Sequence, residues 1–161
     1  MTAVVSLGGN LGDRAAYLRR AIEVIAMQVP VRAVSSLYES APIGVTDSPA
    51  YLNAVVVVDS GDAERVFQAA GAAERSQGRL RSRRWGPRTL DADVIAVDQQ
   101  VSASPRLTLP HPRAHERAFV LMPWLEVDAT ASITGYGPVR RLLEELPDQH
   151  VVRVAPAPPL P

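Results

Sequence analysis

Apolar residues in the first sixty positions follow two spacings, one typical of strands and one typical of helices. Short β-prone runs over residues 3–7, 31–38 and 51–59 predict strands, and the consecutive valines at 55–58 are typical of a central, buried strand. Over residues 13–29, apolar side chains recur every three or four positions with most charges on the opposite side. That spacing predicts an amphipathic helix.

Capping and helix-breaking residues mark where the helices begin and end. Asp13 is expected to cap the first helix, and Pro30 is expected to stop it. Ser60 or Asp62 is expected to cap a second helix that runs to about Gly78. The sequence therefore predicts two helices of similar length, separated by strands.

Two loops and a further strand complete this part of the chain. Prolines and a glycine over residues 40–49 indicate a loop, and residues 82–87 form a polar, basic loop before a strand at 89–97. The order strand-helix-strand-strand-helix-strand predicts an α+β sandwich of ferredoxin-like type, in which helices pack on an antiparallel sheet.

The chain after residue 98 is expected to add C-terminal elements to this sandwich. Its pattern predicts proline-rich loops, two short helices near residues 113–122 and 138–146, and an edge strand at 151–154. Proline and alanine dominate residues 155–161, so this tail is expected to lack regular structure. With no internal repeat and no linker, residues 1–154 are expected to form a single domain.

Composition and charge exclude several classes of protein. The 161 residues carry 17 basic and 17 acidic side chains, so net charge does not favour bulk attraction to nucleic acid or to a membrane. The absence of cysteine excludes disulfides and thiolate nucleophiles, and the absence of lysine excludes a Walker-type phosphate loop. No apolar run reaches the ~20 residues of a membrane span, and no signal peptide is recognisable. A cytoplasmic protein, acting as a monomer, is expected.

Candidate catalytic and binding residues are most frequent over residues 84–93, a stretch that begins with an arginine and ends with two aspartates. Asp91 and Asp93 lie one residue apart in a predicted strand, so their side chains point to the same face. Paired carboxylates suit Mg²⁺, whose shell is often completed by substrate phosphates. The arginines expected to reach phosphate are Arg79, Arg81, Arg84 and Arg88, and Trp85 beside them could be core or could close over a base or pterin ring.

Two smaller groups of residues are candidates for substrate contacts. His111 lies between two prolines after a strand-like stretch and six residues before Arg117, which makes a role in phosphate binding credible. Tyr51, Asn53 and Phe119 could form a pocket for a flat heterocycle, although spacing alone leaves open that both aromatics belong to the core. The other histidines, His115 and His150, are expected to be ordinary surface residues.

Taken together, these residues resemble the 6-hydroxymethyl-7,8-dihydropterin pyrophosphokinase family. The resemblance extends over residues 3–126, and its strongest motif is 84–93. Supporting motifs occur in the family's order at residues 7–13, 51–54, 74, 78–79, 109–112 and 117–119. The sequence departs from the family pattern at Gly9, Ala41 and Gly71, and none of these departures removes a charged site residue.

The resemblance implies transfer of pyrophosphate from ATP to the hydroxymethyl group of the pterin, with release of AMP, in folate biosynthesis. By similarity, two Mg²⁺ ions are held by Asp91 and Asp93, and the catalytic residues are Arg79, Arg88, Asp91 and Asp93. The ATP-binding residues implied are Glu74, Arg81, Trp85, Val94, Thr108, His111 and Arg117. The pterin-binding residues implied are Ser40, Ile43, Tyr51, Asn53 and Phe119.

Two other functions remain open from the residues alone. The same carboxylates could serve a magnesium-dependent nucleotide phosphohydrolase, which would need no aromatic pocket for a pterin. A ferredoxin-like RNA-binding module could use the arginine cluster, although such modules stack bases on aromatic residues of the sheet and these strands offer valine instead.

Overall fold

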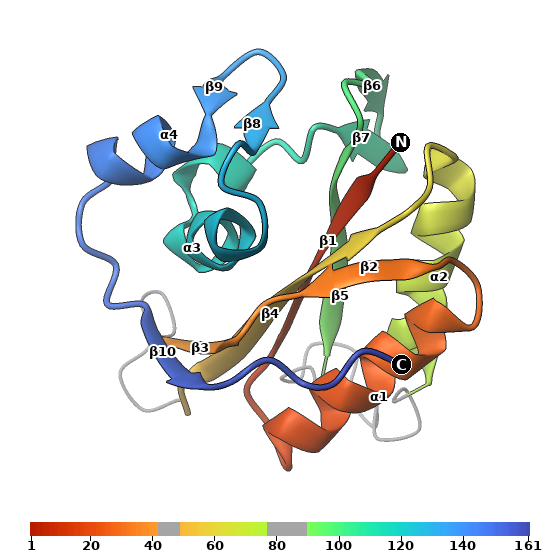
Figure 1. Ribbon diagram of the computed structural model, residues 1–161, viewed down its shortest axis with the longest axis vertical. Helices are drawn as coiled ribbons and strands as arrows, with labels where there is room; N and C mark the ends of the chain where they lie inside the picture. Colours follow the sequence, from red (N-terminus) through yellow and green to blue (C-terminus); the bar gives the residue numbers. More distant parts are fainter. Residues whose placement is uncertain (42–48, 77–89) are drawn as a thin grey trace.

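The computed structural model describes residues 1–41, 49–76 and 90–161. They form three layers, with a central sheet between two layers of helices (Figure 1). Several residues singled out from the sequence lie outside these ranges: Ile43, Arg79, Arg81, Arg84, Trp85 and Arg88. None of the helices in the described ranges combines the length and the hydropathy of a membrane span.

The middle layer is a six-stranded antiparallel sheet. Its strands are β1 (Ala3–Gly9), β2 (Val31–Val34), β3 (Leu37–Ser40), β4 (Tyr51–Val58), β5 (Asp91–Val97) and β10 (Val152–Ala155). Their order is β10-β3-β4-β1-β5, with β2 also paired to β4, so β5 lies at an edge. The predicted strand-helix-strand-strand-helix-strand order is confirmed, except that the strand predicted over residues 31–38 is divided into β2 and β3. The late edge strand is also confirmed, one residue further along than predicted.

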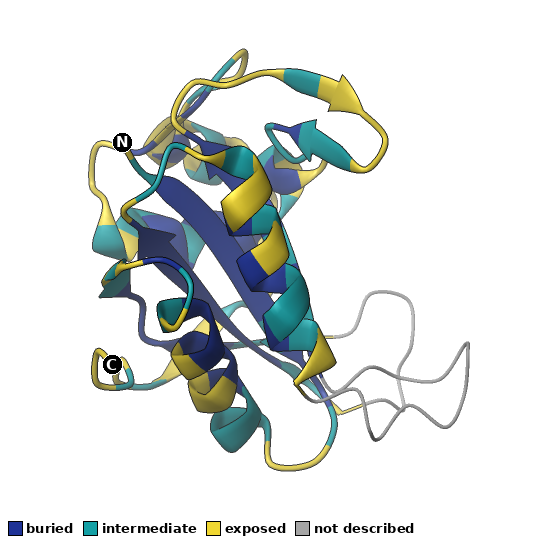
Figure 2. Ribbon diagram, turned by 90° about the vertical axis from the view of Figure 1, so that its right-hand side faces the viewer, coloured by how far each residue is buried: buried dark blue, intermediate teal, exposed yellow. Residues whose placement is uncertain are grey.

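Two helices cover one face of the sheet, and a third helix, with a fourth packed against it, lies on the other face (Figures 1 and 2). On one face, α1 (Arg14–Ala26) and α2 (Ala63–Arg75) pack on Val5, Leu7 and the even-numbered residues of β4. On the other face, α3 (Ala118–Val127) packs on Val4, Val55 and their neighbours, together with α4 (Val139–Glu145). Strand side chains alternate between these two apolar clusters, as the period of a strand requires.

The predicted helix caps are confirmed. The Asp13 carboxylate accepts a hydrogen bond from the backbone N–H of Ala16 at 3.1 Å, and Asp62 accepts one from Arg65 at 3.1 Å. Each bond satisfies one of the backbone donors left unpaired at a helix start. Of the two candidates for the second cap, the structure uses Asp62, and Ser60 instead accepts a bond from the Asp62 N–H.

The strand predicted over residues 31–38 is interrupted, and this part of the prediction was wrong. Between the Val34–Val56 and Tyr38–Asn53 pairs, the β2–β3 segment advances four residues while β4 advances three. The extra residue is accommodated at Ser35, whose buried hydroxyl accepts a hydrogen bond from the Val55 N–H at 2.9 Å. A side chain thus replaces a backbone partner, as at a β-bulge.

The C-terminal half also departs from the predicted boundaries. The helix expected at 113–122 is a 3₁₀ turn, Ala114–Glu116, followed by α3, which continues through Pro123 to Val127. Leu121 and Trp124 are almost completely buried, so packing on the sheet outweighs the hydrogen bond that the proline cannot make. Ala155, expected in the irregular tail, pairs with Leu37.

Two short two-stranded sheets were not fully foreseen. The hairpin of β6 (Ser102–Ser104) and β7 (Leu107–Leu109) contains the strand-like stretch recognised before His111. The second pair, β8 (Ser132–Ile133) and β9 (Gly137–Pro138), precedes α4.

A carboxylate of α3 is hydrogen-bonded to β3 and to the segment just before it. Glu126 of α3 accepts hydrogen bonds from the Ser36 N–H at 3.0 Å, the Ser36 hydroxyl at 2.6 Å and the Tyr38 hydroxyl at 2.8 Å. Burial, followed by the bond to Glu126, raises the pKa of Tyr38 from 10.0 to about 12. These bonds set the distance between the strand that ends at Ser40 and the helix that carries Phe119.

We expect Tyr38→Phe to flatten the alkaline loss of stability. The pKa of Tyr38 is higher in the folded chain, so the unfolded chain releases the proton first and the free energy of unfolding falls as the pH rises past 10. The wild-type protein should lose about 2 kcal/mol more than Tyr38→Phe between pH 10 and pH 12. Urea unfolding of both proteins across this range measures the difference, and parallel curves would contradict the expectation.

Candidate active site

The site lies on the face of the sheet that α3 covers only in part. Along β1, Val4 faces α3, and the residues that follow on the same face are Ser6 and Gly8. Their partners in β5 are Asp93, opposite Ser6, and Asp91, opposite Gly8. Both aspartates therefore lie on one face, as the sequence predicted, beyond the end of the apolar cluster beneath α3.

A cavity of about 290 Å³ opens over this part of the sheet, and we call it the sheet cavity. Its lining brings together seven residues that the sequence analysis placed at a site: Ser40, Tyr51, Asn53, Asp91, Asp93, Arg117 and Phe119. The remaining lining residues are Ser6, Gly8, Ala41 and Arg113. The two aromatic rings, remote in sequence, thus share one cavity.

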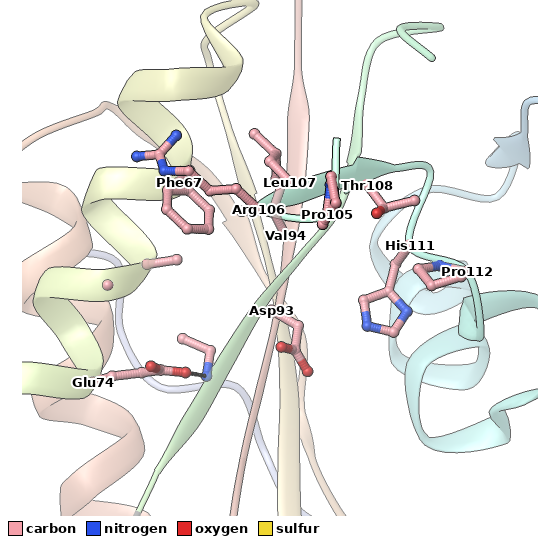
Figure 3. Close-up of a pocket in the computed structure, with 13 residues that line it drawn as sticks. Phe67, Glu74, Asp93, Val94, Pro105, Arg106, Leu107, Thr108, His111 and Pro112 are labelled. Carbon is pink, nitrogen blue, oxygen red and sulfur yellow. Dashed lines mark hydrogen bonds between the residues drawn. The ribbon is translucent and has the colours of Figure 1, made fainter. Parts of the chain in front are cut away.

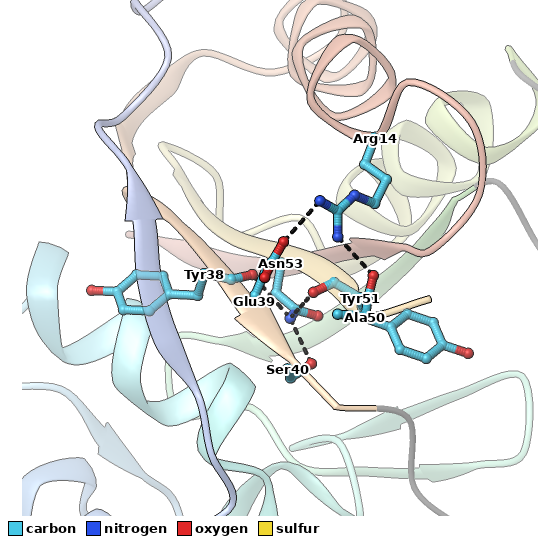
Figure 4. A network of polar contacts seen from close by, with 7 residues as sticks. All are labelled: Arg14, Tyr38, Glu39, Ser40, Ala50, Tyr51 and Asn53. Atoms are coloured by element: carbon cyan, nitrogen blue, oxygen red, sulfur yellow. Dashed lines mark hydrogen bonds and ion pairs between the residues drawn. The ribbon is translucent and has the colours of Figure 1, made fainter. Parts of the chain in front are cut away.

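Asn53 is held rigidly at the floor of the sheet cavity (Figure 4). Its side-chain Nδ2 donates to the Ser40 hydroxyl at 2.8 Å and to the Tyr38 carbonyl at 3.3 Å, and only 3% of the residue is exposed. A Cβ atom on Gly8 would lie 3.1 Å from the Asn53 Oδ1, so the glycine keeps that oxygen uncrowded. With Nδ2 bonded inward, Oδ1 is left as a fixed acceptor.

A second cavity, of about 400 Å³, lies at the free edge of the sheet, and we call it the edge cavity (Figure 3). Its walls come from α2, β5, the β6–β7 hairpin and the turn at His111. The lining residues are Phe67, Ala70, Gly71, Glu74, Ala92, Asp93, Val94, Pro105, Arg106, Leu107, Thr108, His111 and Pro112. Five of the residues assigned to ATP by resemblance lie in the described ranges. Four of them line the edge cavity, namely Glu74, Val94, Thr108 and His111, and Arg117 does not.

Asp93 lines both cavities. Strand β5 is the last strand of the sheet, so the edge cavity wraps around it while the sheet cavity lies over its face. Figure 3 shows the Asp93 side chain among the residues that line the edge cavity. Asp93 is therefore placed where two bound molecules would meet.

Glu74 supports the strand that carries the aspartates. Its Oε1 accepts a hydrogen bond at 2.9 Å from the N–H of Ala92, the residue between Asp91 and Asp93. An edge strand presents backbone donors with no strand partner, and a carboxylate from α2 satisfies this one. The contact couples the wall of the edge cavity to the position of both acids.

The donor set at Asp91 and Asp93 fits magnesium. Across residues 1–41, 49–76 and 90–161 there is no group of three or more His, Cys, Asp or Glu side chains that could hold a metal. Two carboxylates on one strand face are hard oxygen ligands, and Mg²⁺ commonly takes one or two of these together with water and phosphate. The site is thus suited to an ion that arrives with a phosphate-bearing substrate.

His111 is fixed by its backbone beside Asp93. A one-residue bulge in β5 at Ile95 leaves a carbonyl that accepts a bond from the His111 N–H at 2.8 Å. Nδ1 accepts a bond from the Arg113 N–H at 3.2 Å, so a neutral His111 carries its proton on Nε2. Burial lowers the pKa of His111 below its ordinary value, Arg117 and Arg113 lower it further, and Asp93 opposes them.

Each cavity contains one of the two phenylalanines of the chain, and each ring has an arginine over it. The Arg106 guanidinium lies 4.4 Å from the centre of the Phe67 ring, and that of Arg117 lies 5.6 Å from the centre of Phe119. Such contacts hold a cation beside an aromatic surface. Both cavities therefore contain an aromatic ring beside a guanidinium, and in the edge cavity the charge of Arg106 is paired with the Glu64 carboxylate.

Several residues of these cavities were not predicted from the sequence. Phe67 and Arg106 were not singled out, although Phe67 lies seven residues before Glu74, a spacing that places both on one side of a helix. Arg113 was also missed and lines the sheet cavity. His115 was expected to be an ordinary surface residue, which was wrong: its ring stacks on Tyr136 at 4.0 Å, and its Nδ1 is buried. His150 is exposed and pairs with Asp148.

A carboxylate shared by two cavities, with a second carboxylate and arginines beside it, fits an enzyme that transfers a phosphoryl group between two bound substrates. The family model of 7,8-dihydro-6-hydroxymethylpterin-pyrophosphokinase matches residues 4–129. The chain belongs to this family.

Curated relatives match over most of the chain. The 2-amino-4-hydroxy-6-hydroxymethyldihydropteridine pyrophosphokinase of Mycobacterium tuberculosis is 45% identical over 161 residues, covering 91% of this chain and 85% of that protein. The protein of the same name from Methylorubrum extorquens is 39% identical over 155 residues, covering 94% and 98%.

A solved structure shows the same fold. The crystal structure of Plasmodium falciparum HPPK-DHPS with SDX-DHP superposes with a TM-score of 0.66 at 11% identity. The superposition covers 89% of this chain and 44% of that one, so this chain spans less than half of that protein. At this identity the likeness shows the fold alone, and it agrees with the predicted ferredoxin-like sandwich.

Proposed function

We propose that the protein transfers pyrophosphate from ATP to the hydroxymethyl group of 6-hydroxymethyl-7,8-dihydropterin, giving AMP and the pterin diphosphate. Membership of the family supports this reaction. The observation that carries it in the structure is the position of Asp93, which lines both the sheet cavity and the edge cavity. Two substrates bound in these cavities would present their reacting groups to the same carboxylate.

The pterin is assigned to the sheet cavity. Tyr51 and Phe119 offer rings for stacking, and aromatic pairs of this kind favour a flat heterocycle. The Asn53 Oδ1, fixed by the bonds of its amide nitrogen, would accept a hydrogen bond from an N–H on the pterin edge. Ser40 sets the orientation of Asn53, and Ile43 is retained as a contact by resemblance only.

ATP is assigned to the edge cavity, with its phosphates directed toward Asp93. Neutral His111 would donate from Nε2 to a phosphate oxygen, and Arg117 would add positive charge from the sheet side. Glu74, Val94 and Thr108 would contact the nucleoside. Arg79, Arg81, Trp85 and Arg88 are assigned to the phosphates and the nucleotide by resemblance.

Two Mg²⁺ ions held by Asp91 and Asp93 are part of this proposal, and the chemistry they supply is neutralisation of charge on the triphosphate. The pterin hydroxyl oxygen forms a bond to the β-phosphorus of ATP while the bond from that phosphorus to the AMP oxygen breaks, and the hydroxyl proton is released. Such a displacement depends on positioning and charge neutralisation more than on covalent help. The rigid face of β5 supplies the positioning.

We also propose that the enzyme acts in the cytoplasm, where ATP is available, and as a monomer, because one chain lines both cavities. Residues 1–154 are proposed as the pyrophosphokinase domain, since β10 pairs with β3 at the edge of the same sheet. The match to the family leaves the phosphohydrolase and the RNA-binding interpretations without support.

An assay of AMP formation tests the proposed function. Incubation with ATP, Mg²⁺ and the hydroxymethylpterin should release AMP together with the pterin diphosphate, and omission of either the pterin or Mg²⁺ should abolish the signal. AMP or ADP formed at the same rate without pterin would favour the phosphohydrolase and overturn the proposal.

A further inference from the structure

One motif of the sequence is used only in small part by the site described above. Residues 7–13 support the family resemblance, yet of these only Gly8 lines the sheet cavity and none lines the edge cavity. Gly12 adopts a φ of +65°, and a Cβ atom there would lie 2.8 Å from Cε2 of the Tyr17 ring, so the turn requires glycine. Asp13 then caps α1 and sets Arg14 as its first residue.

Arg14 bridges two segments that are distant in sequence (Figure 4). Its Nη2 donates to the Glu39 carboxylate at 2.8 Å, and its Nη1 donates to the carbonyl of Ala50 at 2.8 Å. The side chains of Arg14 and Glu39 are 29% and 37% exposed. A charged fork with two fixed acceptors is a stronger tether than a single surface ion pair.

Both tethered residues immediately precede residues of the sheet cavity. Glu39 comes before Ser40 at the end of β3, and Ala50 comes before Tyr51 at the start of β4. Ser40 and Tyr51 are paired across the two strands, and Ser40 bonds to Asn53. The Arg14 fork therefore holds the last pair of the β3–β4 ladder, where a hydroxyl and an aromatic ring enter the cavity.

We infer that Arg14 is a positioning residue for the pterin site. It acts from the opposite side of the β3–β4 end, through Glu39 and the Ala50 carbonyl, and touches neither cavity. By holding this end of the ladder closed, it presets Ser40, Tyr51 and Asn53 for the heterocycle and reduces the ordering that binding would otherwise require. This inference rests on the proposed function, because it assigns the sheet cavity to the pterin.

The alternative is that Arg14 contributes to stability alone. A purely structural tether would lower the melting temperature and leave the affinity of the folded protein for both substrates unchanged. A positioning residue changes the affinity for the pterin and leaves the nucleotide affinity in place, because the edge cavity is lined from α2, β5 and the β6–β7 hairpin.

Calorimetric titration distinguishes these roles. The hydroxymethylpterin is titrated into protein saturated with Mg²⁺ and a non-hydrolysable ATP analogue, and the analogue is titrated separately. Arg14→Ala should raise the Kd for the pterin about tenfold and change the Kd for the analogue less than about twofold. Arg14→Lys, which keeps the charge without the fork, should fall between Arg14→Ala and the wild type.

Two further variants control this experiment. Arg20→Ala removes an exposed ion pair with Glu23 from the same helix and should change neither affinity. Glu39→Gln keeps the length of the side chain and weakens the tether, so it should raise the pterin Kd by a smaller factor and serves if Arg14→Ala does not fold. Unchanged pterin affinity in Arg14→Ala and Glu39→Gln, or equal weakening of both ligands, would overturn the inference. Wild-type protein that binds the analogue and ignores the pterin would overturn the proposed function as well.

Discussion

Asp93→Ala is expected to lower kcat/KM about thousandfold, because it removes a carboxylate that lines both cavities. This carboxylate is a proposed ligand of the Mg²⁺ ions that neutralise the charge of the phosphates. The fold should survive, since Asp93 is only partly buried and belongs to neither apolar cluster. Steady-state assays of AMP formation measure the loss, and thermal melting measures the stability. The loss should persist at saturating concentrations of both substrates.

The matched control is Asp148→Ala, which removes a carboxylate that is 80% exposed and pairs only with His150 among the described residues. It should leave kcat/KM unchanged. Titration of Mg²⁺ adds a second measurement, because nucleotide binding by Asp93→Ala should lose its dependence on the ion. Turnover by Asp93→Ala within about threefold of the wild type would reject the proposed role of this residue.

The second large effect is expected from the two phenylalanines, which should separate the two substrates. Phe119→Ala should raise the Kd of the pterin about thirtyfold, because a stacking surface in the sheet cavity is lost, and should leave the ATP analogue bound normally. Phe67→Ala should show the reverse pattern, since it removes the ring beneath Arg106 in the edge cavity.

Each phenylalanine variant is the control for the other. Both rings are partly buried and both lie near an arginine, so general destabilisation should affect the two proteins to a similar degree. Calorimetry with each ligand, at a temperature well below both melting transitions, gives four dissociation constants. Exchange of the two patterns, or weakening of both ligands by both variants, would contradict the assignment of the cavities.

Local patterns were sufficient for much of the fold. The alternation of strand side chains correctly placed Asp91 and Asp93 on one face, because the period of a strand is set by backbone geometry. The capping role of Asp13 followed from the chemistry of a single turn and is confirmed. The order of strands and helices was likewise predictable, since each element carries its own apolar period.

Predictions failed where a distant contact outweighed a local preference. The helix after Ala118 runs through Pro123 because Leu121 and Trp124 are buried against the sheet. The break in the strand at Ser35 depends on a hydroxyl that replaces a ladder partner on β4. His115 is stacked on Tyr136, which lies twenty-one residues later, so the residues next to the histidine do not indicate this contact.

For the candidate site, residue types were predictable from the sequence, but their division between two ligands came only from the family resemblance. Spacing alone could not decide whether Tyr51 and Phe119 share a pocket, and Phe67, Arg106 and Arg14 were overlooked. Their contacts join α1, α2 and the β6–β7 hairpin to strands far away in the sequence. These contacts form only when the apolar faces of distant elements pack together, so the spacing of residues within one element does not predict them.

The sequence by itself determined the elements, the shared face of the two acids and the family to which the chain belongs, because each of these is written in short motifs and spacings. The tertiary structure alone decided that β5 lies at the edge of the sheet and that Asp93 therefore borders two cavities. The physical reason is that strand order and cavity shape depend on which distant surfaces exclude water together, a property of the assembled chain.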